Sequence, residues 1–242
     1  MKRGRWIIWL AGLGLIALTA RLGVWQLDRA AQKLALHAER EERARAPALA
    51  EAALPRDAAG AAALAQRLAV VAGRWLPASS VYLDNRPMAG RVGFFVLTPL
   101  ELADGSVLVV QRGWWPRDAA ERTRIAAPPP AAGEVRVKGR IAPTPSRSFE
   151  LAPDAPGPIR QNLDLDAFAR ETRLPLRPWV LVQQDDAAVP VADGLLRQWA
   201  EPAADVHKHY GYAVQWFALA ALTLLLLLWF QIVRPWRRQR AQ

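Results

Sequence analysis

The chain has 242 residues, of which 52% are hydrophobic, and it carries a net charge of +10 with no cysteine. The absence of cysteine excludes thiolate nucleophiles, cysteine metal sites and disulfides. All 22 acidic residues lie between Asp28 and Asp205 together with 23 of the 32 basic ones, so the basic excess is concentrated outside that region. A nucleic-acid-binding domain concentrates its charge on a folded face, and this distribution argues against one.

The first apolar stretch begins after a basic start, residues 1–5, and predicts a transmembrane helix over residues 6–25. Residues 6–20 alone would span about 22 Å, and the helix reaches about 30 Å by including Arg21, whose head group can extend to the interface. A cleaved signal peptide is the alternative. We favour an uncleaved anchor because the helix-like pattern runs on without a break into a predicted helical stalk, residues 26–46.

A second apolar stretch, residues 210–233, contains no charged residue and predicts a second transmembrane helix of about 36 Å. The tail that follows, residues 234–242, carries four arginines. Because basic flanks stay in the cytoplasm, we expect both termini there and the region between the spans outside, which is the periplasm of a bacterium. The Ala- and Arg-rich composition suggests a bacterial chain.

Between the spans, residues 47–209 alternate between strand patterns and turn signals. Residues 47–65 indicate a loose linker or short helix, and a short helix is predicted over residues 162–172. Ala103-Asp104-Gly105 indicates a hairpin turn. Strands are predicted at 66–75, 80–86, 92–102, 106–115, 134–141 and 177–184. The predicted fold class is a membrane-anchored α+β protein, with two transmembrane helices flanking a mainly antiparallel β periplasmic domain with minor helices.

Motifs of common enzymes are missing from the sequence, which contains no nucleophile elbow, phosphate loop or HExxH. GLGLIA matches a dinucleotide fingerprint formally, but it lies inside an apolar span where small residues serve helix packing. The aspartate pairs at 164/166 and 185/186 are explained more simply by turns and helix starts. We therefore predict a protein that is not an enzyme.

Two cations follow the first span on one helix face, because Trp25, Arg29 and Lys33 are spaced four residues apart. They could contact acidic groups of a partner or the carboxylates of a cofactor. Contact with lipid phosphates is the simpler interpretation of these residues alone.

Two of the three histidines, His207 and His209, precede the second span and point to nearly opposite sides of a helix, so they cannot share one ion. His209 lies on what we call the histidine face, which comprises His209, Tyr212, Ala213, Trp216 and Ala220. Such a face could seat a flat apolar cofactor with His209 on its iron. Anchoring at the membrane interface is the alternative. His37 lies about 18 Å beyond Trp25 along the stalk and is a poor second ligand.

Three blocks of the sequence together resemble the surfeit locus protein 1 family, in the right order along nearly the whole chain. GVWQLDRAAQK matches the segment after the family's first span, and KHYGYAVQWF matches the start of its second. The region between them contains similar D-N-R, G-x-x-G, T-P-L and R-G-W blocks. The residues carrying the match there include Asn85, Arg86, Gly93, Arg112 and Gly113. Tyr210 and Gly211 depart from the pattern, which affects packing.

The resemblance implies an assembly factor for haem-copper cytochrome c oxidase, held in the bacterial inner membrane or its mitochondrial counterpart and surrounded by membrane lipids. It would help haem a reach subunit I, with haem a synthase as a further partner. The resemblance also implies transient haem a binding with His209 on the iron beside Tyr212 and Trp216. Trp25, Gln26, Arg29 and Lys33 become contacts for the propionates or the oxidase subunit, and Asn85, Arg86, Gly93, Arg112 and Gly113 become structural. A haem-free scaffold that stabilises subunit I during assembly is the alternative, and a membrane-anchored enzyme is a weaker one.

Overall fold

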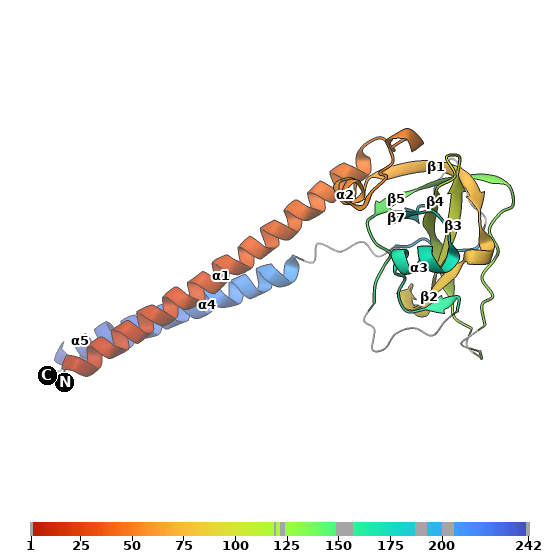
Figure 1. Ribbon diagram of the computed structural model, residues 1–242. Coiled ribbons are helices and arrows are strands. Elements are labelled where there is room, and N and C mark those ends of the chain that lie inside the picture. The colour runs from red at the N-terminus through yellow and green to blue at the C-terminus, as the bar shows by residue number, and fades with distance from the viewer. Residues whose placement is uncertain are drawn as a thin grey trace. The chain divides into compact units, whose positions relative to one another are not determined.

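A computed structural model of the protein describes residues 2–118, 120–121, 124–148, 157–186, 193–199 and 206–240. The chain divides into two compact units (Figure 1). One, here called the helix pair, combines Met1–Glu39 with Pro202–Gln242, and the other, the barrel domain, is Arg40–Glu201.

The helix pair brings the two apolar stretches of the sequence together. Helix α1 runs without a break over Lys2–Arg45, so the predicted span and stalk are one helix. Helix α4 covers His207–Leu228 and continues through a five-residue π-helix, Trp229–Val233, into α5, Arg234–Arg240. Two helical stretches, Trp6–Arg45 and His207–Arg237, are long and apolar enough to cross a membrane, which supports a membrane protein.

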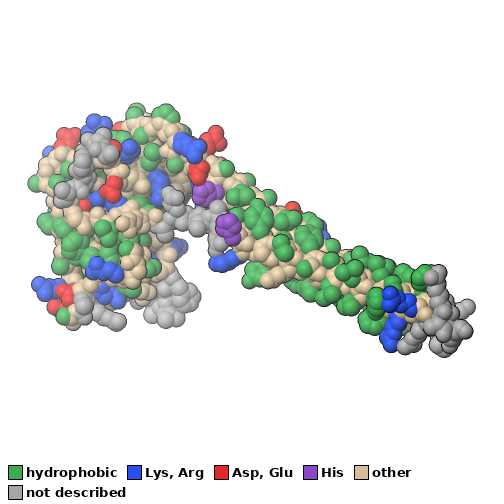
Figure 2. All heavy atoms as spheres, turned by 180° about the vertical axis from the view of Figure 1, so that it is seen from behind, with side chains coloured by type: hydrophobic (Ala, Val, Ile, Leu, Met, Phe, Trp, Pro, Cys, Tyr) green, Lys and Arg blue, Asp and Glu red, His purple; other side chains and the backbone are tan. Residues whose placement is uncertain are grey.

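The two helices pack antiparallel through small residues on α1. A Cβ atom at Gly12 would lie 2.8 Å from the Leu227 side chain, and one at Gly23 would lie 2.8 Å from the Phe217 ring. Glycine at these two positions therefore permits the close approach of the neighbouring helix. Hydrophobic side chains cover much of the outer surface of the pair (Figure 2), as expected of a surface that faces lipid.

The barrel domain contains a closed β-barrel of five strands in the order β1-β5-β7-β4-β3, closed by the pairing of β1 with β3. Two further strands, β2 and β6, extend the sheet from β3. The pairs β4–β7 and β2–β6 are parallel and the other pairs are antiparallel. The strands are β1 Leu68–Trp75, β2 Val81–Met88, β3 Arg91–Leu102, β4 Val107–Pro116, β5 Glu134–Ala142, β6 Ile159–Arg160 and β7 Leu176–Gln183.

Alternating side chains of the five barrel strands fill its interior, as the period of two in the sequence requires. This core includes Val71, Leu100, Leu108, Val137 and Leu181, one from each strand. A second apolar cluster contains Leu83, Leu97, Val109 and Val180 and is covered by Phe168 of α3, Leu165–Thr172. Asp164 caps this helix by accepting a hydrogen bond from Ala167 N, which confirms its predicted role at a helix start.

The segment predicted as a loose linker or short helix is more ordered than expected. It forms a 3₁₀ turn, Glu51–Ala53, and helix α2, Ala58–Ala63. The carbonyl of Pro55 accepts hydrogen bonds from the indole of Trp179 at 2.9 Å and the guanidinium of Arg177 at 3.2 Å. These two bonds hold the segment against β7, a pairing across more than 120 residues that local sequence patterns cannot reveal.

Candidate functional site

The histidine singled out by sequence meets a polar residue of the other span. His209 lies in the first turn of α4, and its Nδ1 is 2.7 Å from Oε1 of Gln26 on α1. Both side chains are half-buried. The contact joins residues 183 positions apart, and it brings together one residue expected as an iron ligand and one expected as a partner or propionate contact.

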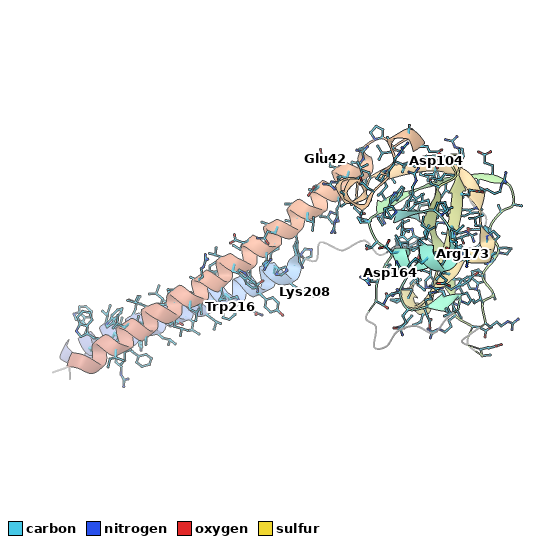
Figure 3. All side chains as sticks on the ribbon, in the orientation of Figure 1. Glu42, Asp104, Asp164, Arg173, Lys208 and Trp216 are labelled. Carbon is cyan, nitrogen blue, oxygen red and sulfur yellow. The ribbon has the colours of Figure 1, made fainter. Side chains whose placement is uncertain are left out.

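The histidine face turns toward α1 rather than standing open. Ala213 is only 2% exposed and Ala220 only 8%, while Trp216 is half-buried on the same side of α4 (Figure 3). Tyr212 lies at the edge of this face and is 52% exposed. At Ala213 and Ala220 the face has no open surface in this structure, because the neighbouring helix occupies that space, and a cofactor seated on the face stays a prediction. A ligand of His209 has to approach from the edge of the pair.

Aromatic side chains flank the Gln26–His209 contact on one edge. Trp25 immediately precedes Gln26, and Tyr212 immediately precedes Ala213. Each residue turns an α-helix by about 100°. In an antiparallel pair, a residue that directly precedes an interface residue on one helix therefore lies on the same edge of the pair as its counterpart on the other helix. Trp25 and Tyr212 are both about half-exposed, so the edge offers two amphipathic rings beside the histidine.

The predicted cations lie next to this edge. The Arg29 guanidinium is centred 5.6 Å from the Trp25 ring and donates a hydrogen bond of 3.2 Å to Gln32. Lys33 is exposed one turn further on. The structure thus brings Trp25 and Arg29 together and leaves both cations accessible to an anionic group, whether on a cofactor, a partner or a lipid.

An apolar groove of about 490 Å³ lies elsewhere on the helix pair. Its lining includes Ile8 and Leu15 of α1 with Leu226 and Phe230. Leu15 is the last residue of α1 that lines the groove. Leu15 is eleven residues from Gln26, or about 16 Å along the helix. The groove is therefore separate from the site around His209.

His209 is the side chain of this site that could ligate a haem iron. Among the residues that the structure describes, no three His, Cys, Asp or Glu side chains gather to hold an ion. Haem supplies four ligands of its own and needs from the protein only an axial group such as imidazole. With Nδ1 of His209 engaged by Gln26, Nε2 is the nitrogen available for that role.

The family-motif residues of the barrel domain have structural tasks. A Cβ atom at Gly93 would collide with the carbonyl of Trp115 and the ring of Trp114, and one at Gly113 would collide with Leu195. Asn85 has a φ of +58° at an irregularity between β2 and β3, a conformation that asparagine tolerates well.

Arg86 is a buried cation that links three chain segments. Its Nη2 donates to the carbonyls of Ser146 at 3.1 Å and Gln161 at 2.6 Å. Its own carbonyl accepts a 2.8 Å hydrogen bond from the indole of Trp114. The D-N-R and R-G-W blocks therefore meet in space.

Arg112 forms a second buried cluster that sequence reasoning missed in part. Its Nη2 lies 3.2 Å from Asp193, and Arg197 lies 2.5 Å from the same carboxylate, so two guanidinium groups share one buried anion. Burial lowers the pKa of the Arg112 guanidinium, and the Asp193 charge opposes that shift. Burial also raises the pKa of the Tyr82 phenol, while the positive charge of Arg112 acts in the opposite direction.

Two predicted turn aspartates serve instead as counter-ions. Asp185 accepts a 3.1 Å hydrogen bond from Arg197, and Asp186 lies 3.4 Å from Lys138. Nothing in the local sequence marks Asp193 or Arg197 as partners of Arg112, because the residues lie 81 and 85 positions apart from it.

Comparison with known proteins gives a consistent result. The pattern that defines the SURF1 family matches residues 13–221. A SURF1-like protein of Rickettsia felis is 25% identical over 209 residues, covering 82% of this chain and 85% of that protein. A SURF1-like protein of Monosiga brevicollis is 27% identical over 237 residues, covering 92% of this chain and 87% of the relative.

Proposed function

We propose, from the premise that the chain belongs to the SURF1 family of cytochrome oxidase assembly factors, that it binds haem a transiently during assembly of haem-copper cytochrome c oxidase. Subunit I would receive the haem and haem a synthase would supply it. The protein acts as a carrier or chaperone and catalyses no reaction of its own. The observation that carries the proposal is the half-buried imidazole of His209, oriented by Gln26 at the edge of the helix pair.

The residues around this imidazole have distinct tasks in the proposal. His209 would hold the haem iron through Nε2, and the rings of Trp25 and Tyr212 would provide apolar surface at the same edge. Arg29 and Lys33 neutralise carboxylates of the ligand or of the oxidase subunit. Because one ligand at an exposed edge binds more weakly than two ligands in a closed pocket, the arrangement favours release, as a carrier requires.

The proposal is tested by comparing pigment in purified full-length protein. The protein would be isolated from cells that make haem a, and its visible spectrum compared with that of His209→Ala. His207→Ala is a matched control, because His207 is an exposed imidazole two residues away on the same helix. We expect most of the haem to be lost from His209→Ala and retained by His207→Ala.

The same experiment separates the alternative function. Equal haem in His209→Ala and wild type would reject the ligand role. Haem-free protein that copurifies with subunit I would instead support a scaffold that stabilises an assembly intermediate.

The proposed location is a bacterial inner membrane, with both termini in the cytoplasm and the barrel domain in the periplasm. The chain contains no cysteine, so single cysteines report their side of the membrane without background. We expect a membrane-impermeant maleimide to label Glu134→Cys, an exposed position on β5, in intact spheroplasts. Gln242→Cys should react only after lysis, and the reverse result would invert the topology.

A further inference from the structure

We propose that Gln26 is a positioning residue for His209, because its amide oxygen holds the imidazole in the tautomer whose Nε2 is free to ligate iron. The role in ligation rests on the proposed function. The tautomer itself is a property of the haem-free protein and can be measured without any haem.

The first step is the direction of the hydrogen bond. Oε1 of Gln26 has lone pairs and no hydrogen, so it can only accept. The 2.7 Å separation from Nδ1 of His209 therefore requires a hydrogen on Nδ1. In a neutral imidazole the other nitrogen, Nε2, then carries the lone pair that a metal needs.

The second step is the rigidity of the contact. Gln26 lies three residues after Gly23, whose missing side chain lets the Phe217 ring of α4 come close. The Phe217 ring packs into the space left by Gly23, so the two helices are in contact within one turn of the hydrogen bond. Because both side chains are half-buried, water competes less for either partner than it would at an exposed site.

The third step is the effect on ligand strength. A hydrogen-bond acceptor on the distal nitrogen of a ligating histidine fixes the ring and makes the ligating nitrogen more basic. A neutral amide does this less strongly than a carboxylate. Glutamine therefore orients His209 while keeping its bond to iron weak enough for a ligand that has to be passed on.

The haem-free test measures the tautomer directly. In a full-length protein carrying His37→Gln and His207→Gln, His209 is the only histidine, and ¹⁵N spectra separate protonated from unprotonated ring nitrogens. We expect hydrogen on Nδ1. Gln26→Leu should shift the population toward hydrogen on Nε2, whereas Gln32→Leu, on the exposed side of the same helix, should leave it unchanged.

The haem-loaded test uses the same variants. We expect Gln26→Leu to weaken haem retention by about tenfold, the lower end of what loss of such a partner costs. Gln26→Glu should restore retention, raise the iron–histidine stretching frequency and lower the reduction potential of the haem below the wild-type value. Gln26→Leu should shift the frequency and the potential in the opposite directions to Gln26→Glu. A merely structural role for Gln26 would not produce such opposite shifts in the two variants.

The outcomes distinguish this inference from the proposed function. Hydrogen on Nε2 in the wild type, or a tautomer and haem spectrum unchanged by Gln26→Leu, would overturn the positioning role while leaving His209 as a ligand. A wild type with hydrogen on Nδ1 that binds no haem would reject the proposed function and retain the orientation by Gln26.

Discussion

The polar side chains that lie away from water have different kinds of partner in the barrel domain and in the helix pair. In the barrel domain, Arg86 donates to backbone carbonyls of two other segments, and Arg112 and Arg197 share the carboxylate of Asp193. In the helix pair, the contact between Gln26 and His209 engages Nδ1 of the imidazole, and the proposed ligand would bind the other ring nitrogen, Nε2.

This difference separates the family motifs by task. Burying a charge is costly unless it is paired and hydrogen-bonded, so the barrel arginines are explained by the fold they hold together. A half-buried imidazole at an exposed edge stabilises little, and in our proposal its role is to bind a ligand. Substitutions in the barrel should therefore change stability, and substitutions in the helix pair should change ligand binding.

The largest effect is expected from Asp193→Ala, which leaves the Arg112 and Arg197 guanidinium groups sharing no buried anion. Removing one partner of a buried ion pair costs about 3–5 kcal/mol. We expect hydrogen exchange in the full-length protein to rise across β4 and β7 and to stay unchanged in α4. Glu171→Ala removes an exposed ion-pair partner and should cost less than about 1 kcal/mol. Equal losses of stability in Asp193→Ala and Glu171→Ala would show that the buried ion pair matters no more than the exposed one.

Trp114→Phe tests the contact between the two barrel motifs. The variant keeps most of the buried ring but removes the N–H that donates to the carbonyl of Arg86. A buried acceptor without its donor costs about 1–3 kcal/mol. Chemical unfolding followed by near-ultraviolet circular dichroism should show this loss, with haem retention by the folded protein unchanged. Trp115→Phe, at the half-buried neighbouring position, is the control and should have a smaller effect.

Local patterns in the sequence predict the elements well and their long-range partners poorly. Strand β5 follows from its alternation, and the hairpin at Asp104 follows from its turn residues (Figure 3). Closure of the barrel depends on Gly73 pairing with Leu102, where any side chain at Gly73 would collide with the carbonyl of Glu101. That requirement becomes visible only once the strands are placed.

The same limit applies to the candidate site. Helical spacing predicts that His209, Trp216 and Ala220 share a face, but the sequence cannot say what covers it. The contact between Gln26 and His209 joins two residues, one on each helix, that are 183 positions apart along the chain, with the barrel domain between them in sequence. Asp193 is missed for a similar reason, since its role is defined by two distant arginines rather than by its neighbours.

Gly23→Leu tests whether the helix pair serves the histidine rather than overall stability. The new side chain would meet the Phe217 ring, and overpacking of this kind costs about 1–3 kcal/mol. The higher helix propensity of leucine offsets up to about 1 kcal/mol of that cost. We expect the Nδ1–H population of His209 and the haem content to fall, with hydrogen exchange in the barrel unchanged.

Two variants make the Gly23 experiment specific. Gly14→Leu makes the same change on the same helix where nothing lies within 4 Å, so it should leave His209 unaffected. Adding Phe217→Ala to Gly23→Leu should make room for the new side chain and restore the contact between Gln26 and His209. Loss of haem in Gly14→Leu would show instead that any added bulk on α1 disturbs the pair.

The smallest effect is expected at Asp104, whose contribution to the stability of the barrel depends on pH. Hydrogen bonds from Ser106, with a further contribution from Arg177, lower the pKa of Asp104 at the β3–β4 turn. Because its pKa is lower folded than unfolded, Asp104 adds stability above the unfolded pKa of about 3.9, and this is lost as the pH falls through the folded value. Asp104→Asn should therefore destabilise the barrel at pH 6 and make little difference near pH 2. Since the side chain is half-exposed, the effect should shrink in high salt. Unfolding midpoints at the two pH values measure it, and a larger loss at the lower pH would reverse the assigned sign.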